Sequence, residues 1–175
     1  SILRDNGYKT ALFGKWHLGE PPDYGPLRSG YEEFFGSLSG AIDYFTHKSP
    51  RGPDGAPDLY ENESPVERDG YYTYLLTDEA KKFISRCAAD NSPFFMSVHF
   101  TAPHWPWEGP NDEAVARELK DLWHYDGGNL KVYADMVKAL DQSVGRILDE
   151  LNRQSLTDNT IVVFTSEDRK STRLN

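Results

Sequence analysis

Residues 72–99 read YTYLLTDEAKKFISRCAADNSPFFMSVH, and this stretch contains two hydrophobic patterns of different period. Up to Ala89 the apolar residues recur at steps of three and four, which predicts an amphipathic helix. After Asn91, residues 93–99 form a short and nearly continuous apolar run, which predicts a strand covered on both faces. A helix followed closely by a buried strand is typical of α/β proteins.

The sequence on both sides continues this alternation. Residues 8–13 predict a short strand that ends at Gly14. On the other side, residues 112–122 predict a short helix and residues 130–154 predict a long helix with one apolar face. Residues 160–166, TIVVFTS, predict a third strand. This order predicts an α/β fold with a mostly parallel sheet flanked by helices.

A long segment without apolar periodicity lies between the first strand and the first full helix. Residues 49–70 contain four prolines, which predicts an extended surface loop. We interpret the acidic run within it, residues 54–69, as a solvated stretch of chain.

Both ends of the chain predict that it is part of a longer protein. Residues 1–7 read as the last turn of a helix that stops at Asn6 and Gly7. Residues 169–175 turn abruptly basic and polar, and we interpret them as a non-native tail. We therefore expect a single unit over residues 1–168, truncated at both ends.

The composition argues against several classes of protein. Hydrophobic residues make up 38% of the 175, enough to form a core, which argues against global disorder. A formal net charge of −9 argues against a general nucleic-acid coat. The apolar runs are only a few residues long, too short for a membrane-spanning helix. The single cysteine, Cys87, excludes an internal disulfide framework, and its spacing predicts a core position.

Reactive side chains follow each of the three predicted strands. Lys15 and His17 follow the first, His104 follows the second, and Glu167 and Asp168 follow the third. In α/β sheets, ligands bind beyond the carboxyl ends of the strands. A lysine and histidines beside an acidic pair suit an anionic oxygen cluster next to a hard cation. The sequence contains no serine elbow, glycine-rich phosphate loop or zinc-binding spacing of Cys and His.

The sequence of these segments resembles that of the type I sulfatases, within the alkaline-phosphatase-like superfamily, and is most similar to the arylsulfatase B branch. The signature G-K-W-H-L-G is the most specific match. The segments that carry the resemblance, in the family's order, are 14–19 (GKWHLG), 30–36 (GYEEFFG), 43–44 (DY), 102–106 (APHWP), the helix 133–151 and 164–166 (FTS).

The resemblance implies an alkaline-phosphatase-like fold and the hydrolysis of a sulfate ester to an alcohol or phenol and sulfate. Residues 1–168 would then be part of the catalytic domain. By the same resemblance, Lys15 contacts the sulfate and a formylglycine residue, His17 lies beside the formylglycine hydroxyl, and His104 binds the sulfate near its bridging oxygen. Lys15 and His104 would therefore both bind substrate and, with His17, form the catalytic set.

Two cofactors are also implied by the resemblance. The family makes its formylglycine from a Cys or Ser in a C/S-x-P-x-R motif, which is absent from this chain, and Cys87 lacks the Pro and Arg of that motif. The family's calcium ion is held partly by an Asp-Asn pair after the last strand, where this chain has Glu167 and Asp168. Because the nucleophile lies outside the chain, we expect the isolated fragment to be inactive.

Other interpretations of the same residues stay open. A phosphate- or phosphonate-ester hydrolase of the same superfamily would use similar groups, and a non-catalytic module could use the histidines only to hold an anion. The expected partner is a small-molecule or glycan sulfate ester, without nucleic acid and without a membrane segment in this chain. The resemblance to the family suggests a secreted, periplasmic or lysosomal location.

Overall fold

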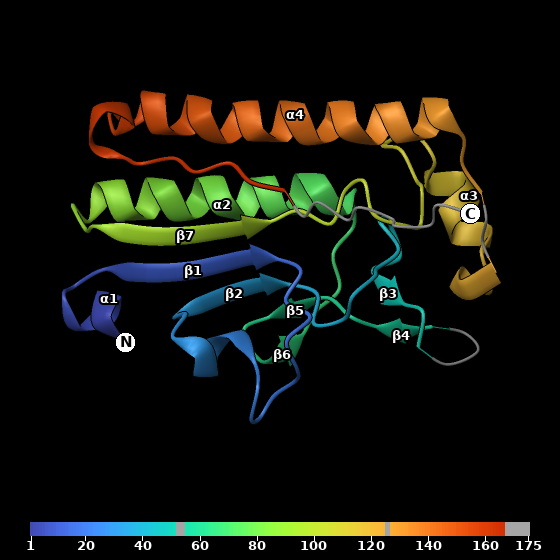
Figure 1. Ribbon diagram of the computed structural model, residues 1–175, viewed down its shortest axis with the longest axis horizontal. Coiled ribbons are helices and arrows are strands. Elements are labelled where there is room, and N and C mark those ends of the chain that lie inside the picture. Colours follow the sequence, from blue (N-terminus) through green and yellow to red (C-terminus); the bar gives the residue numbers. More distant parts are fainter. Residues whose placement is uncertain (52–54, 125–126, 167–175) are drawn as a thin grey trace, which may run out of the picture.

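The computed structural model describes residues 1–51, 55–124 and 127–166, which form a sheet with two long helices beside it (Figure 1). The helices and strands are α1 (Ile2–Asp5), β1 (Lys9–Gly14), η1 (Pro26–Ser29), β2 (Glu33–Gly36), β3 (Lys48–Ser49), β4 (Ala56–Pro57), β5 (Tyr60–Glu61), β6 (Ser64–Pro65), α2 (Tyr72–Ala89), β7 (Phe94–His99), α3 (Glu113–Glu118), η2 (Leu122–His124), α4 (Leu130–Arg153) and η3 (Thr157–Asn159).

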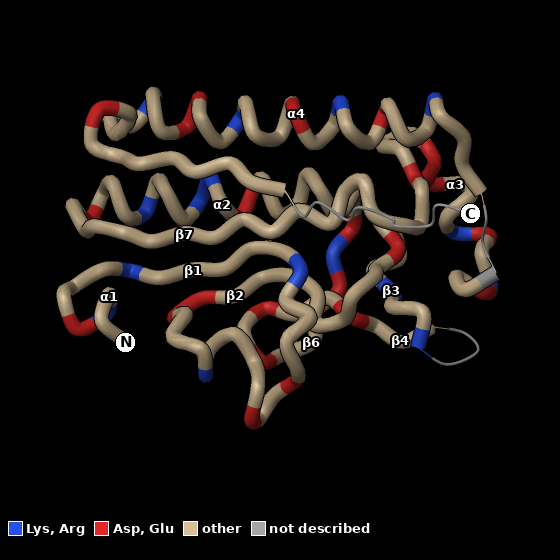
Figure 2. The backbone as a smooth tube through the Cα atoms, viewed as in Figure 1, with Lys and Arg blue, Asp and Glu red and all other residues tan. Residues whose placement is uncertain are grey.

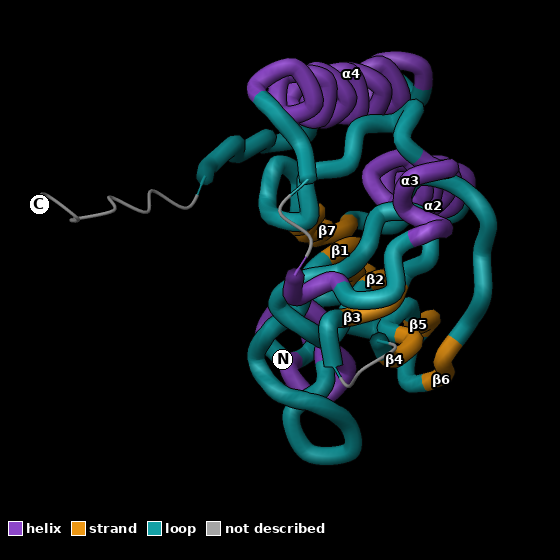
Figure 3. Tube along the Cα trace, turned by 90° about the vertical axis from the view of Figure 1, so that its right-hand side faces the viewer, coloured by secondary structure: helices purple, strands orange, loops and turns teal. Residues whose placement is uncertain are grey.

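The main sheet has the strand order β6-β5-β2-β1-β7. Strand β1 lies between β2 and β7 and runs parallel to both, while β5 and β6 are added beyond β2 in antiparallel orientation. The predicted α/β class is therefore confirmed, and the parallel part of the sheet consists of β2, β1 and β7. Figure 3 looks at the carboxyl ends of these strands, with α2 against one face of the sheet and α4 beyond β7.

The core lies between α2 and the sheet. The stripe of α2 that faces the strands is buried, and Phe83 from this stripe packs edge-on against Phe13 of β1, with ring centroids 5.8 Å apart, and against Phe94 of β7, at 5.9 Å. Cys87 belongs to the same core cluster, as the sequence predicted. Aromatic pairs of this geometry contribute packing beyond the area that they bury.

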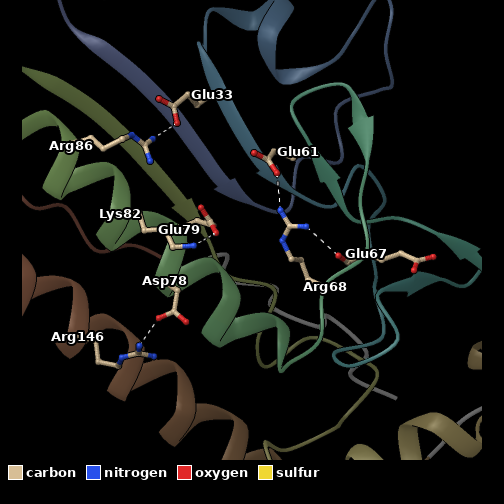
Figure 4. Close-up of polar contacts among 9 residues, drawn as sticks. All are labelled: Glu33, Glu61, Glu67, Arg68, Asp78, Glu79, Lys82, Arg86 and Arg146. Carbon is tan, nitrogen blue, oxygen red and sulfur yellow. Dashed lines mark hydrogen bonds and ion pairs between the residues drawn. The ribbon is translucent and has the colours of Figure 1, made fainter.

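The long helix α4 packs on α2 rather than on the sheet. Met136 and Ala139 of α4 are buried, and Arg146 forms an ion pair of 2.5 Å with Asp78 of α2 (Figure 4). On α2 itself, Arg86 forms an ion pair with Glu33 of β2, which ties the helix to the sheet. Charged residues recur along α4 (Figure 2), and among the described residues no helix is both long enough and apolar enough to cross a membrane.

The start of α4 is capped by a side chain. Asn129 Oδ1 accepts hydrogen bonds from the amides of Lys131, at 2.9 Å, and Val132, at 3.1 Å. We expect Asn129→Ala to lower the unfolding free energy by about 1 kcal/mol, because these amides then lose their protein acceptor. Asn129→Asp keeps the acceptor and is the matched control. Urea unfolding of both variants checks this, and equal stability of Asn129→Ala and the wild type would contradict it.

The segment predicted as a surface loop is more structured than expected. Residues 49–70 contribute β4, β5 and β6, and β5 joins the main sheet by pairing with β2. Leu59 is buried in the core, although the surrounding prolines and charges hide any apolar period. Strands of two residues leave no readable alternation, so tertiary pairing decides their formation.

The prediction of a third strand at residues 160–166 is wrong. Residues 160–166 belong to no helix or strand, and the side chains of Ile161 and Val163 are 92% and 79% exposed. β7 is also less covered than a continuous apolar run predicts, since it lies at the edge of the sheet and Phe95 is 43% exposed. A strand needs a hydrogen-bonded neighbour, and the described sheet pairs no strand with residues 160–166.

Candidate functional site

The parallel strands β1, β2 and β7 end together, at Gly14, Gly36 and His99 (Figure 1). The backbones approach so closely here that a Cβ on Gly14 would lie 2.1 Å from the His99 carbonyl oxygen. A Cβ on Gly36 would lie 2.0 Å from the carbonyl oxygen of Gly14. Because no side chain separates the strand ends, the loops that follow them emerge side by side.

Lys15 and His17 occupy the loop that follows β1. The amide of Lys15 donates to the carbonyl of His99, at 3.0 Å, and the amide of His17 donates to the carbonyl of Leu38, at 3.1 Å. The loop is therefore bonded to the last residue of β7 and to the segment after β2. The side chain of His99 lies at this edge too, because its Nδ1 contacts the carbonyl oxygen of Lys15 at 3.1 Å.

The residue between Lys15 and His17 anchors this loop. Trp16 is buried, and its indole N–H donates to the carbonyl of Tyr24 at 2.8 Å. His17 has a left-handed backbone with φ of 56°, and its ring packs on Gly40, where a Cβ would lie 2.4 Å from the imidazole. Lys15, before Trp16, is half-buried, and His17, after it, is exposed. The anchoring side chain is therefore buried, while the two flanking side chains reach the surface.

His104 lies in the loop after β7. Its amide donates to the carbonyl of Thr101 at 2.8 Å, and its carbonyl accepts a hydrogen bond from the buried Tyr44 hydroxyl at 3.1 Å. The ring Nδ1 lies 2.7 Å from the carbonyl oxygen of Trp105. A carbonyl oxygen only accepts, so Nδ1 carries the proton, and the neutral ring keeps its lone pair on Nε2.

The structure thus places Lys15, His17 and His104 in loops at one edge of the sheet. Their catalytic and substrate-binding roles remain predictions. The proposed metal ligands Glu167 and Asp168 lie outside the described residues.

The described residues do not supply the two cofactors that the resemblance implies. Over residues 1–51, 55–124 and 127–166, no three His, Cys, Asp or Glu side chains come together as metal ligands. Cys87 is buried in α2, and burial raises the pKa of its thiol to about 11, so it does not have the properties of a reactive nucleophile.

Buried acidic residues behind the loops were not predicted from the sequence. Asp58, assigned to a solvated run, is only 4% exposed, and its two oxygens accept the amides of Leu38, at 3.2 Å, and Ser39, at 3.0 Å. Burial raises the pKa of Asp58. This carboxyl holds the loop on which the His17 ring packs. The apolar Leu59 beside it was the only local signal of burial.

Comparison with known proteins assigns the chain to a family. The family model described as Sulfatase matches residues 1–172. The chain belongs to the sulfatase family. The resemblance drawn from the short motifs is therefore confirmed over most of the chain.

Curated relatives agree with this assignment. This sulfatase chain is 33% identical to N-acetylgalactosamine-6-sulfatase of Mus musculus, over 95% of the chain and 31% of the relative. It is 30% identical to arylsulfatase J of Mus musculus, over 94% of the chain and 27% of that protein. The sulfatase chain spans about a third of the length of the curated relatives that it matches.

Solved structures show the same fold. The sulfatase chain superposes on the crystal structure of Ps i-CgsB in complex with k-i-k-neocarrahexaose with a TM-score of 0.72 and 30% identity. The match covers 90% of the chain and 37% of that structure. Other structural neighbours are named as sulfatases, such as PsFucS1 sulfatase from Pseudoalteromonas sp., so the alkaline-phosphatase-like sulfatase fold is confirmed for the described part of the chain.

Proposed function

We propose that the protein containing this chain hydrolyses sulfate esters to an alcohol or phenol and sulfate, and that this chain forms part of the wall that binds the sulfate. The observation that carries the proposal is the bonding of the Lys15–His17 loop to the same sheet edge from which the His104 loop emerges. A cation and two imidazoles at one edge suit a tetrahedral oxyanion.

Each of the three side chains has a distinct part in this proposal. The Lys15 ammonium neutralises charge that develops on the sulfate oxygens. In its protonated form, His104 carries its second proton on Nε2, since Nδ1 is held by the Trp105 carbonyl. The bridging oxygen takes this proton as the S–O bond breaks, and the bonding electrons leave with that oxygen. The sulfo group would pass to a hydroxyl oxygen that the formylglycine outside this chain supplies, and His17 would accept a proton from the hydroxyl of that formylglycine.

The substrate class follows from the relatives and is part of the proposal. One relative is named N-acetylgalactosamine-6-sulfatase, and the structure of Ps i-CgsB contains k-i-k-neocarrahexaose. These names favour a sulfated glycan over a simple aryl sulfate. In the longer protein we propose that calcium and a formylglycine, made from a Cys or Ser outside this chain, complete the site, with residues 1–168 as the native part of the domain.

The isolated 175-residue chain should show no turnover of an aryl sulfate or a sulfated sugar in the presence of calcium. The reason is that its one cysteine lies in the core and no nucleophile motif precedes Lys15. Sulfate release is the measurement, with the longer protein as the positive control. Turnover by the isolated chain above its Lys15→Ala variant would contradict this.

A comparison of sulfate and phosphate esters on the longer protein tests the reaction itself. We expect kcat/KM to be higher for the sulfate ester. Faster hydrolysis of a phosphate or phosphonate ester would replace the proposal with the related hydrolase. Binding of both anions without hydrolysis of either would instead indicate an anion-binding module.

A further inference from the structure

Two carboxyl groups lie buried behind the His104 loop. Asp43 is 1% exposed and Glu108 is 0% exposed. Glu108 Oε2 accepts the amide of Tyr44 at 2.9 Å, and Asp43 Oδ1 accepts the amide of Phe45 at 2.9 Å. The remaining oxygens, Asp43 Oδ2 and Glu108 Oε1, are buried and have no hydrogen-bond donor among the described residues. An ionised carboxylate buried without a donor or a cation is costly.

Among the described residues, the groups that act most strongly on Glu108 include no cation. These groups are Asp43, Asp112 and the amide of Tyr44, and the Tyr44 hydroxyl lies in turn near Tyr71 and Tyr72. Burial lowers the pKa of His47, which interacts with Asp43, so this ring is neutral at pH 7. Burial, followed by the charge of Asp43, raises the pKa of Glu108 to about 8. The Glu108 carboxyl also lies within hydrogen-bonding reach of the Asp43 carboxyl, and two carboxyls so placed share one proton rather than ionise together.

We propose that Glu108 is protonated at neutral pH and donates a hydrogen bond from Oε1 to Asp43 Oδ2, and that this shared proton positions the loop that carries His104. Hydrogen bonds from two tyrosine hydroxyls hold the same segment, which contains both His104 and Glu108. The Tyr71 hydroxyl donates to the Glu108 carbonyl at 2.8 Å, and the Tyr44 hydroxyl donates to the His104 carbonyl at 3.1 Å. Glu108 is thus a positioning residue. Only its bearing on catalysis rests on the proposed function of His104.

The proposal predicts how the stability of the folded chain changes with pH. Below the usual glutamate pKa of 4.5, Glu108 is protonated in both the folded and the unfolded chain, and its contribution to stability is complete. Between 4.5 and about 8, only the folded chain keeps the proton, so stability falls as the pH rises. Over this interval the equilibrium constant for unfolding should rise by about tenfold per pH unit from this group alone.

Glu108→Gln is the sharpest test. The amide has the shape of the carboxylic acid and carries a permanent N–H donor for Asp43 Oδ2, while its oxygen can still accept the Tyr44 amide. Urea unfolding of the 175-residue chain across this pH interval is the measurement. We expect the ratio of the wild-type to the variant unfolding constant to rise by about tenfold per pH unit, so that above pH 8 the variant is the more stable protein.

Asp112→Asn is the matched control. It removes a nearby acid but keeps the oxygen that accepts the Gly109 amide, at 2.7 Å. This variant should retain the one-proton dependence of the wild type. The proposal would be overturned if the ratio of the wild-type to the Glu108→Gln unfolding constant did not change with pH. It would also be overturned if the unfolding constants of the wild type and of both variants changed equally with pH.

A second substitution and a spectroscopic readout keep the test independent of activity. Asp43→Asn alone should also be tolerated, because its amide can donate to an ionised Glu108. The double variant should be less stable than either single variant, since two NH₂ groups then face each other. The infrared carbonyl band of a protonated carboxylic acid should be present at neutral pH in the wild type and absent in Glu108→Gln.

A buried cation between the two carboxylates is the rival arrangement. It would give no such infrared band, and added calcium would raise the stability of the wild type but not that of Glu108→Gln. Either result would overturn the shared proton while leaving sulfate ester hydrolysis untouched. Conversely, a failed sulfate assay on the longer protein would leave the proton measurement unaffected.

Discussion

Lys15→Ala in the longer sulfatase should lower kcat/KM for a sulfate ester by about 100- to 1,000-fold, because the site then loses a cation that stabilises charge on the sulfate oxygens. The backbone of Lys15, which is bonded to His99, is unaffected by the substitution. We therefore expect the unfolding free energy to change by about 1 kcal/mol or less. Steady-state kinetics and urea unfolding of the same preparation separate the two effects.

Lys9→Ala is the matched control for this experiment. Lys9 is an exposed lysine on the same strand, β1, but at its amino end, far from the strand edge that carries Lys15. Its removal should leave kcat/KM within about twofold of the wild type, since surface substitutions of this kind have small effects. Equal activity of Lys15→Ala and Lys9→Ala would remove Lys15 from the site.

Gly14→Ala should lower the unfolding free energy by at least about 3 kcal/mol. The residue has φ of +123°, and the new Cβ would lie 2.1 Å from the carbonyl oxygen of His99, so β1 and β7 would have to separate. The same movement would displace the loop of Lys15 and His17. Urea unfolding checks the stability, and kcat/KM of the longer protein should fall together with it.

Gly145→Ala is the opposite case in the same chain. This glycine lies within α4, and a Cβ there would meet nothing within 4 Å. Because alanine favours a helix more than glycine does, we expect the unfolding free energy to rise by about 0.5–1 kcal/mol. If Gly14→Ala were as stable as Gly145→Ala, the close approach of the strands would not be required.

The elements that were predicted correctly are those with long local signals. α2 and α4 each carry an apolar stripe over several turns, and their bounds agree with the prediction to within a residue. The strand β7 lies where the apolar run after Asn91 placed it. β2 was missed, because Glu33–Gly36 is short and was noticed only as part of an aromatic, glycine-rich motif.

The site residues show the same division. Lys15, His17 and His104 could be proposed from the sequence because each follows a readable strand and lies in a motif that resembles a family signature, and their roles stay predictions. Asp43 and Glu108 could not be paired from the sequence, since 64 residues separate Glu108 from its bonded neighbour Tyr44. No local pattern distinguishes a buried, protonated glutamate from a solvated one.

The sequence by itself determined the two long helices, the strands β1 and β7, and which reactive side chains follow those strands, because periodicity and motifs are local properties of the chain. Tertiary structure alone decided that β5 joins the sheet, that residues 160–166 remain unpaired, and that Asp58, Asp43 and Glu108 are buried. The physical reason is that strand pairing, burial and proton sharing each depend on a partner that lies far away along the chain.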